Sequence, residues 1–239
     1  MQNNAIYVVA TPIGNFGDIS LRALETLKSV DVILCEDTRV TKNLLNHYGI
    51  KKPLMSYHQH SDARKVKEIL ALLDMGKNLA LVTDAGTPGI SDPGNMLVQS
   101  VVASMATSSK GEIASSPVGT HRNDSVIPIP GASAVITALS ISGFPTDKFT
   151  FFGFPPHKNK RQKYFKEIAV CEHTAVFYES GHRILKCLAE LKEVLQPERK
   201  MVVCRELTKK FETIYRGTID EVIANMKNEK GEFVVIINS

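Results

Sequence analysis

The chain has 239 residues, 43% of them hydrophobic, which is enough to bury the core of one large domain or two small ones. No stretch approaches the roughly 18 apolar residues of a membrane span, and no basic region precedes the first apolar run as in a signal peptide. The net charge of +4 is modest, so composition argues against membrane-spanning and secreted proteins without indicating a partner.

The four cysteines, Cys35, Cys171, Cys187 and Cys204, are widely spaced and form no C-x-x-C motif. This spacing argues against a disulfide framework and against a zinc site. We therefore expect buried thiols in a reducing cytoplasm and no bound metal.

Short β-branched runs alternate with helical patterns in the first half of the chain. Leu21, Leu24 and Leu27, for example, recur at helical spacing behind a possible cap at Ser20. We expect strands at 5–10, 31–35, 53–58 and 78–83, and helices at 20–30, 40–49, 62–76 and about 95–105. This alternation indicates an α/β domain with a mainly parallel sheet.

Residues 104–125 break this rhythm, because they are small and polar and show no periodicity. We interpret them as a flexible insertion, with one α/β domain at 1–120 and a second at 121–239. In the second domain we expect strands at 126–130, 149–154, 174–179, 201–207, 211–217 and 232–237, and helices at 132–141, 183–195 and 218–227, with a basic helix after the strand at 149–154. The neighbouring strands at 201–207 and 211–217 predict antiparallel pairing, and hence a mixed sheet.

The excess positive charge lies in the second half of the chain. Residues 1–125 contain 12 Lys and Arg against 12 Asp and Glu, whereas residues 126–239 contain 17 against 13. The segment HKNKRQKYFK, residues 157–166, has five cations and no acid. Such a run favours an anionic partner, although a solvated helix face is the simpler explanation of the run taken alone.

Unusual segments follow four of the expected strands: ATPIGNFGD (10–18), CEDTR (35–39), TDAGTPGISDPG (83–94) and PGAS (130–133). In open α/β sheets, ligands bind beyond the carboxyl ends of the strands. We therefore expect these four loops to converge on one ligand-binding crevice.

The loop at 83–94 has the most specific composition of the four. Gly86 and Gly89 permit positive φ and leave no Cβ in the way of a ligand, and Pro88 fixes the backbone before binding. Asp84 and Asp92 supply carboxylates to a positively charged or hydroxyl-bearing ligand. An ordinary tight turn is the alternative, but two acids and five glycines or prolines within residues 84–94 favour a binding loop.

Several common motifs are absent from the sequence. There is no G-x-x-x-x-G-K-[ST], no G-x-G-x-x-G and no G-x-S-x-G, which removes the main support for a nucleoside triphosphatase, a dinucleotide-dependent dehydrogenase or an α/β hydrolase. His58 and His60 form an H-x-H pair, but no further metal ligand stands at a matching distance. We expect them to line the crevice as hydrogen-bonding or acid–base groups, or to stabilise the end of their strand.

Taken together, the motifs resemble those of tetrapyrrole-methylase-like (class III) methyltransferases that act on small-subunit ribosomal RNA. The segments that carry the resemblance are 7–39, SYHQH (56–60), LVTDAGTPGISDPG (81–94), VIPIPGASA (126–134), FYESGHR (177–183) and CRELTKKFETIYRG (204–217). The resemblance implies a homodimer of two-domain α/β subunits. It also implies S-adenosylmethionine-dependent methylation of the ribose 2′-hydroxyl of a cytidine in the 16S ribosomal RNA of the small ribosomal subunit.

By the same resemblance, S-adenosylmethionine binds folded in a cleft between the two domains. The residues assigned to this donor are Pro12, Gly14, Asp84, Gly86, Pro88, Gly89, Ala132, Ser133, Phe152 and Tyr178. Phe152, Tyr178 and Glu179 lie at expected strand ends where an adenine could be sandwiched, although Phe152 could equally be a core aromatic.

The implied reaction is in-line transfer of a methyl group to a poor nucleophile, which a general base would assist. Glu36 and Asp37 are the candidate bases, because the CEDTR loop opens onto the expected crevice. Arg39 would hold a phosphate, although an Asp37–Arg39 pair that merely ties the loop together is the alternative. The residues assigned to RNA are His58, Lys158, Lys160, Arg161 and Lys163, through contacts that weaken with salt.

The chain departs from the family pattern in several places. Gly181 stands where proline is usual, Gln59 stands where an acid is usual, and 104–125 has no counterpart. Members also commonly continue into a small helical tail where this chain reaches Ser239. Three other functions stay open at this point: a C-methyltransferase of a tetrapyrrole precursor, a non-catalytic RNA-binding assembly factor, and phosphotransfer through glycine-rich loops.

Overall fold

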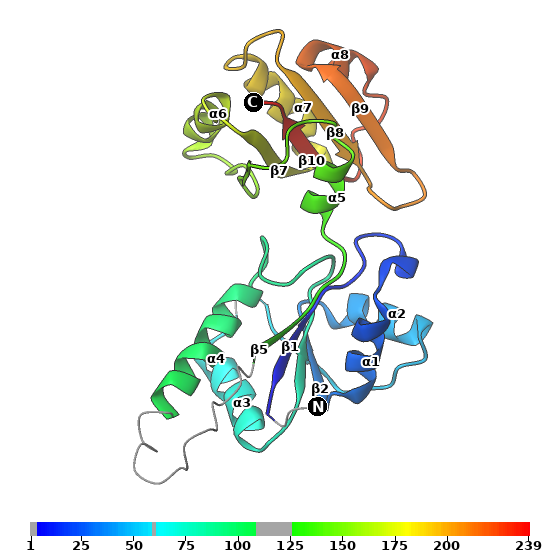
Figure 1. Cartoon of the computed structure of the whole chain (residues 1–239), viewed down its shortest axis with the longest axis vertical. Coiled ribbons are helices and arrows are strands. Elements are labelled where there is room, and N and C mark those ends of the chain that lie inside the picture. Colours follow the sequence, from blue (N-terminus) through cyan, green and yellow to red (C-terminus); the bar gives the residue numbers. More distant parts are fainter. Residues whose placement is uncertain (1–3, 59–60, 109–125) are drawn as a thin grey trace. The chain divides into compact units, whose positions relative to one another are not determined.

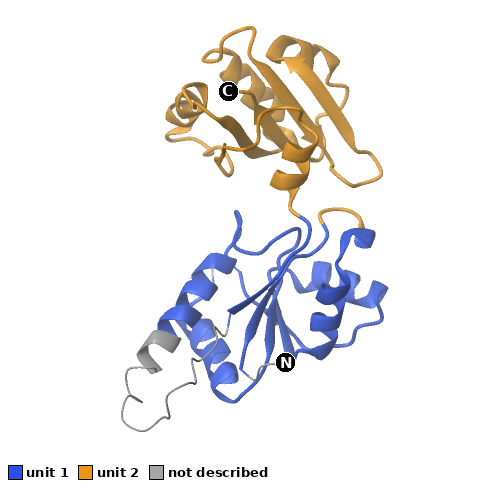
Figure 2. Ribbon diagram, in the orientation of Figure 1, with its two compact units in different colours: residues 1–12, 16–132 blue, residues 13–15, 133–239 orange. Residues whose placement is uncertain are grey.

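A computed structural model describes residues 4–58, 61–108 and 126–239. The chain forms two compact units, shown in different colours in Figure 2. The first unit comprises residues 1–12 and 16–132, and the second comprises residues 13–15 and 133–239. Each unit is built around its own five-stranded sheet.

The sheet of the first unit is entirely parallel. Its strands are β1 (Ile6–Val9), β2 (Val32–Cys35), β3 (Leu54–Ser56), β4 (Leu79–Leu81) and β5 (Val126–Ile129), in the order β3-β2-β4-β1-β5. In register, Tyr7 of β1 lies between Ala80 of β4 and Ile127 of β5. The prediction of a mainly parallel first sheet is confirmed.

Helices cover both faces of this sheet (Figure 1). They are α1 (Leu21–Ser29), α2 (Thr38–His47), α3 (Ala63–Asp74) and α4 (Gly94–Ser108). Leu27 of α1 and Leu45 of α2 pack with one set of strand residues, whereas Ile69 of α3 and Leu97 of α4 pack with the alternate set. Two-sided burial explains why the strands are apolar runs rather than alternating patterns.

The end of the first unit differs from the sequence-based expectation. Helix α4 continues to Ser108, through the first residues of the expected insertion at 104–125. The remainder of that insertion, and with it the expected domain boundary at 120/121, lies outside the described residues. Strand β5 pairs with β1 and therefore completes the first sheet rather than opening the second domain.

The second unit contains a mixed sheet, as predicted. Its strands are β6 (Phe149–Phe151), β7 (Thr174–Ser180), β8 (Lys200–Arg205), β9 (Thr213–Thr218) and β10 (Glu232–Ile237), in the order β6-β7-β10-β8-β9. Strands β6 and β7 are parallel, and the other three pairings are antiparallel. The expected pairing of β8 with β9 is present, with Val203 opposite Tyr215.

Helices also cover both faces of the second sheet. They are α5 (Ala134–Ser140), α6 (Arg161–Ala169), α7 (Gly181–Lys192) and α8 (Ile219–Asn225). Phe177 of β7 packs into the core with α6, α7 and α8. Tyr178, the next residue along β7, is instead hydrogen-bonded to the backbone of Val135 in α5. Because side chains alternate across a strand, α5 covers the face opposite to the other three helices.

Three of the four cysteines, Cys35, Cys187 and Cys204, are buried, and none of the four forms a disulfide. Within the described residues, no helix is both long enough and apolar enough to cross a membrane. The same residues contain no group of three metal-binding side chains placed to hold an ion.

Candidate functional site

The loops that follow β1 and β4 are joined directly at the carboxyl end of the first sheet. The Thr11 amide donates to the Gly86 carbonyl at 2.9 Å, and the Gly86 amide donates back to the Thr11 carbonyl at 3.1 Å. The Thr11 hydroxyl also donates to the Thr83 carbonyl at 3.0 Å. Thr11 and Thr83 were not among the predicted site residues, although each lies two residues after the end of a strand.

The loops that follow β2 and β5 meet the same loop. The Thr83 hydroxyl is 3.4 Å from a carboxylate oxygen of Glu36, and the Asp37 amide donates to Asp84 at 3.1 Å. The Thr87 hydroxyl donates to the Ala132 carbonyl at 3.2 Å. The four segments that the sequence predicts to converge therefore do so at one end of the first sheet.

Glu36 and Asp84 form the acidic part of this end. Partial burial raises the pKa of Glu36, and the negative charge of Asp84 raises it further. The pKa of Asp84 is also raised, first by partial burial and then by the charge of Asp37. Two carboxyls with raised pKa values on adjacent loops are typical of a functional site.

Asp37 behaves differently from its neighbour Glu36. It caps helix α2 by accepting the Arg39 amide at 2.8 Å, and it pairs with the Arg39 guanidinium at 2.6 Å. These contacts lower the pKa of Asp37 to about 2. Arg39 therefore lies in the first turn of α2 rather than in a loop, and the alternative of a local Asp37–Arg39 pair is present in the structure. A carboxyl this acidic is a weak proton acceptor, so Asp37 is the poorer of the two candidate bases.

The loop at 83–94 uses several of its polar groups to hold its own shape. Asp92 accepts the Gly89 amide and the Gly94 amide, each at 2.8 Å. Gly86 and Gly89 have φ values of 84° and 89°, which L-residues with a Cβ rarely adopt. Asp92 is thus a structural residue and not, as predicted, a carboxylate offered to a ligand. The amides of Gly86 and Gly89 are likewise engaged within the protein.

Gly14, assigned to the donor, groups with the second unit. A Cβ on Gly14 would overlap the side chain of Lys209 and would lie 3.0 Å from both the Leu207 carbonyl and the Thr208 hydroxyl. Thr208 itself has a φ of 64°, so this turn is strained. Glycine is therefore needed where the segment after β1 packs on the turn between β8 and β9.

The aromatic residues assigned to the donor face opposite sides of the second sheet. Phe152 packs edge-on to Tyr164, at a centroid distance of 5.9 Å, against the hydrophobic core. Tyr178 instead contacts the rings of Phe151 and Phe154, at 5.1 and 5.3 Å. The structure therefore supports Phe152 as a core aromatic, and Phe151 and Phe154 were not among the predicted site residues.

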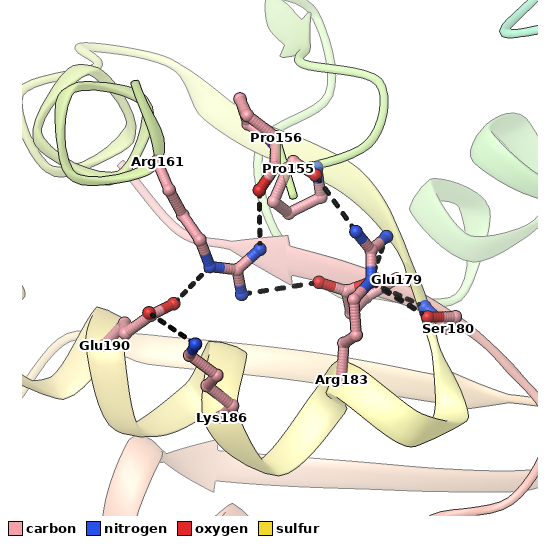
Figure 3. Close-up of polar contacts among 8 residues, drawn as sticks. All are labelled: Pro155, Pro156, Arg161, Glu179, Ser180, Arg183, Lys186 and Glu190. Atoms are coloured by element: carbon pink, nitrogen blue, oxygen red, sulfur yellow. Dashed lines mark hydrogen bonds and ion pairs between the residues drawn. The ribbon is translucent and has the colours of Figure 1, made fainter. Parts of the chain in front are cut away.

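Arg161 and Glu179 are buried partners rather than exposed site residues (Figure 3). Arg161 pairs with Glu190 and lies 3.6 Å from Glu179, and Arg183 pairs with Glu179 at 2.6 Å. The predicted roles were an RNA contact for Arg161 and a position beside an adenine for Glu179. Because both side chains are withdrawn into this cluster, neither assignment fits the structure.

The other residues assigned to RNA are exposed. Lys158 and Lys160 precede α6, and Lys163 on its first turn lies 3.7 Å from Glu167. His58 is exposed beyond β3 and is close enough to Glu36 to influence its pKa. His60 lies outside the described residues.

Comparison with known proteins assigns the chain to a family. A family model described as Tetrapyrrole (Corrin/Porphyrin) Methylases matches residues 5–223. The chain belongs to this tetrapyrrole methylase family. Members use S-adenosylmethionine as methyl donor, and so the cofactor prediction is confirmed.

Curated relatives of this tetrapyrrole methylase cover nearly all of the chain. A protein named Ribosomal RNA small subunit methyltransferase I from Synechocystis sp. is 47% identical over 97% of the chain and 78% of the relative. A protein of the same name from Escherichia coli O157:H7 is 44% identical over 97% of the chain and 77% of the relative.

Solved structures share the fold at much lower identity. The methyltransferase CobJ has a TM-score of 0.68 at 16% identity, covering 98% of this chain and 94% of CobJ. The uroporphyrin-III-C-methyltransferase from Thermus thermophilus has a TM-score of 0.65 at 15% identity, covering 98% of this chain and 94% of that enzyme. Identities this low show that this tetrapyrrole methylase shares its fold with these enzymes, but they say nothing about its substrate.

The described residues of this tetrapyrrole methylase fit a sulfonium donor. A Cβ on Gly89 would lie in ordinary van der Waals contact with Asn95, 3.7 Å from its amide nitrogen, so glycine is favoured there by its φ of 89° rather than by lack of room. Glu36 and Asp84 place negative charge at the same end of the sheet. A positively charged sulfonium complements these carboxylates.

Proposed function

We propose that the chain methylates the ribose 2′-hydroxyl of a cytidine in the 16S ribosomal RNA of the small ribosomal subunit. The observation that carries this proposal is the identity of 47% and 44%, over 97% of the chain, to proteins named for methylation of small-subunit ribosomal RNA. The likeness to tetrapyrrole C-methyltransferases is limited to the fold, so it favours no tetrapyrrole substrate.

The donor residues of this proposal come from both units: those of the first unit lie at the carboxyl end of its sheet, and Tyr178 belongs to the second unit. S-adenosylmethionine supplies a methyl group that its positive sulfonium activates for transfer. Pro12, Pro88 and Ala132 provide apolar side chains, and the two prolines restrict the backbone. Asp84 supplies an exposed carboxylate. Gly14, Gly86, Gly89 and Ser133 complete the set, and Phe152 packs against the core of the second unit.

Glu36 is the general base of this proposal. Its carboxylate accepts the proton of the ribose hydroxyl, so that the oxygen can form a bond to the methyl carbon. Its raised pKa makes it a stronger proton acceptor than an ordinary glutamate. Asp37 and Arg39 position the start of α2 beside it.

We assign RNA binding to exposed cations only, and so Arg161, which is buried, is not included. In this proposal Lys158, Lys160 and Lys163 contact phosphates. His58 lies close enough to Glu36, the proposed general base, to influence its pKa. Such phosphate contacts contribute affinity without sequence information.

We further propose that the protein works as a homodimer in the cytoplasm. Light scattering coupled to gel filtration measures the mass directly, and a monomer at micromolar concentration contradicts the dimer.

The decisive experiment is methyl transfer from labelled S-adenosylmethionine to purified small ribosomal subunits, followed by nuclease mapping of the labelled nucleotide. Label on the 2′-oxygen of one cytidine is the expected result. Label on a base, label on a nucleotide other than cytidine, or no transfer despite tight donor binding contradicts the proposal. Glu36→Gln serves as the inactive control.

A further inference from the structure

An exposed aromatic ring stands at the point where the chain leaves β6. Phe154 has 49% of its surface exposed, and its ring lies 5.3 Å from that of Tyr178. The Tyr178 amide donates to the Gly153 carbonyl at 2.9 Å, which fixes the backbone just before Phe154. Tyr178 is itself held by its bond to the backbone of Val135. Phe154 therefore presents a ring supported from behind and open to solvent.

The residues after Phe154 are held from below by the buried charge cluster of Figure 3. Arg183 donates to the Pro155 carbonyl at 3.4 Å, and Arg161 donates to the Pro156 carbonyl at 3.1 Å. Glu179, fully buried, lies between the two guanidiniums. Two prolines, the buried Arg161 and the partly buried Arg183 thus fix this loop, so little conformational entropy is lost when it binds a ligand.

Two lysines follow on the same loop. Lys158 and Lys160 are exposed, and neither has an ion-pair partner among the described residues. Glu167, the next acid along the chain, lies 3.7 Å from Lys163, and Glu179 and Glu190 pair with arginines. The loop 153–160 therefore combines one open aromatic ring with two uncompensated positive charges.

We propose that the loop 153–160 binds a single-stranded stretch of the RNA substrate. The Phe154 ring stacks on an unpaired base, and Lys158 and Lys160 contact the phosphates beside it. This inference rests on the proposed function and identifies the part of the chain that reads the RNA strand. The lysines favour RNA over the adenine of the methyl donor, because S-adenosylmethionine carries no phosphate. An aromatic platform with adjacent cations is the usual composition of single-strand binding sites.

Arg161 and Arg183 are positioning residues in this proposal. They do not touch RNA, but they hold the two carbonyl groups that follow Phe154. Because removing a buried arginine leaves Glu179 uncompensated and endangers the fold, the test uses exposed residues instead.

The test compares Phe154→Ala with Phe149→Ala, a phenylalanine at the other end of β6 that is 39% exposed. Binding of a fluorescent single-stranded RNA and of its duplex is measured at several salt concentrations, and donor binding is measured by calorimetry. We expect Phe154→Ala to weaken single-strand binding roughly tenfold, with an unchanged salt dependence, and Phe154→Trp to restore it. Lys158→Ala with Lys160→Ala should instead flatten the salt dependence.

Different results separate this inference from the proposed function. If the wild type methylates small ribosomal subunits but Phe154→Ala binds RNA and turns over as well as Phe149→Ala, the loop is not the RNA platform and the proposed function stands. If Phe154→Ala weakens S-adenosylmethionine instead of RNA, the ring belongs to the donor site and the inference is overturned. If the wild type transfers no methyl group to the subunits, the proposed function itself is wrong.

Discussion

At the scale of single residues, Glu36 and Asp37 illustrate how neighbours in sequence acquire opposite chemistry. Asp37 receives an amide and a guanidinium from Arg39, which stabilise its ionised form. Glu36 is half-buried and faces Asp84, so that its ionised form is disfavoured. The same short loop thus supplies a helix cap with a lowered pKa and a carboxylate with a raised pKa.

We predict that Glu36→Gln lowers the rate of methyl transfer by about 10²- to 10⁴-fold, while the variant still binds S-adenosylmethionine. The wild-type rate should fall as pH drops through the raised pKa of Glu36, above the usual value of about 4.3 for a glutamate. Single-turnover rates measured against pH check both statements. Asp37→Asn is the matched control and should leave this acidic limb in place.

The same substitution carries a prediction for stability. A carboxyl whose pKa is raised on folding destabilises the native state once pH exceeds its unfolded pKa. Glu36→Gln removes this cost, so the variant should be at least as resistant to urea as the wild type at neutral pH. Equal or greater stability with lost activity marks a functional residue, whereas lower stability would point to a structural one.

At the scale of elements, the loop at 83–94 depends on Asp92 for its shape. We predict that Asp92→Ala destabilises the protein by about 1–3 kcal/mol, because two amides lose their partner. Donor affinity should fall as well, since the loop no longer holds Gly89 in place. Urea titration and calorimetry measure the two effects. Ser91→Gly, next to it at a φ of 62°, should not destabilise the loop.

The start of α7 explains one departure from the family pattern. A Cβ on Gly181 would overlap the Glu229 carbonyl and lie 2.8 and 2.9 Å from backbone atoms of Gly231. We predict that Gly181→Ala destabilises the second unit by about 1–3 kcal/mol, because backbone must move to admit the methyl group. His182→Ala, an exposed neighbour, should change the urea midpoint little. Equal effects of the two substitutions would contradict this reading of Gly181.

Most helices and strands could be predicted from the sequence, but the contacts between residues far apart in the sequence could not. Apolar runs and glycine-rich loops reveal β1, β4 and the loop at 83–94, because their signals are local. The burial of Arg161 depends on Glu179 and Glu190, which come from other elements and leave no trace in a basic run. The pairing of β5 with β1 is equally non-local, so the sequence assigned that strand to the wrong side of the domain boundary.

At the scale of the whole molecule, the reactivity of the buried cysteines can measure the unfolding of each unit separately. Cys35 lies in the first unit, whereas Cys187 and Cys204 lie in the second, and burial raises the pKa of all three thiols. We predict one fast-reacting thiol, Cys171, which is only half-buried, and three slow ones.

Mass spectrometry after timed alkylation identifies the labelled cysteines. Gly181→Ala should accelerate labelling of Cys187 and Cys204 without affecting Cys35, if the two units unfold independently. Equal acceleration at all three would mean that the units unfold together.

The position of β5 has a consequence for synthesis of the protein. Strand β1 leaves the ribosome well before β5 (Val126–Ile129), which is one of its two neighbours in the sheet. Until that strand emerges, one row of β1 amides and carbonyls faces water and can pair with any extended peptide nearby. A truncated translation product that stops before Val126 should therefore be prone to aggregation. The nascent chain has most need of a chaperone during that interval.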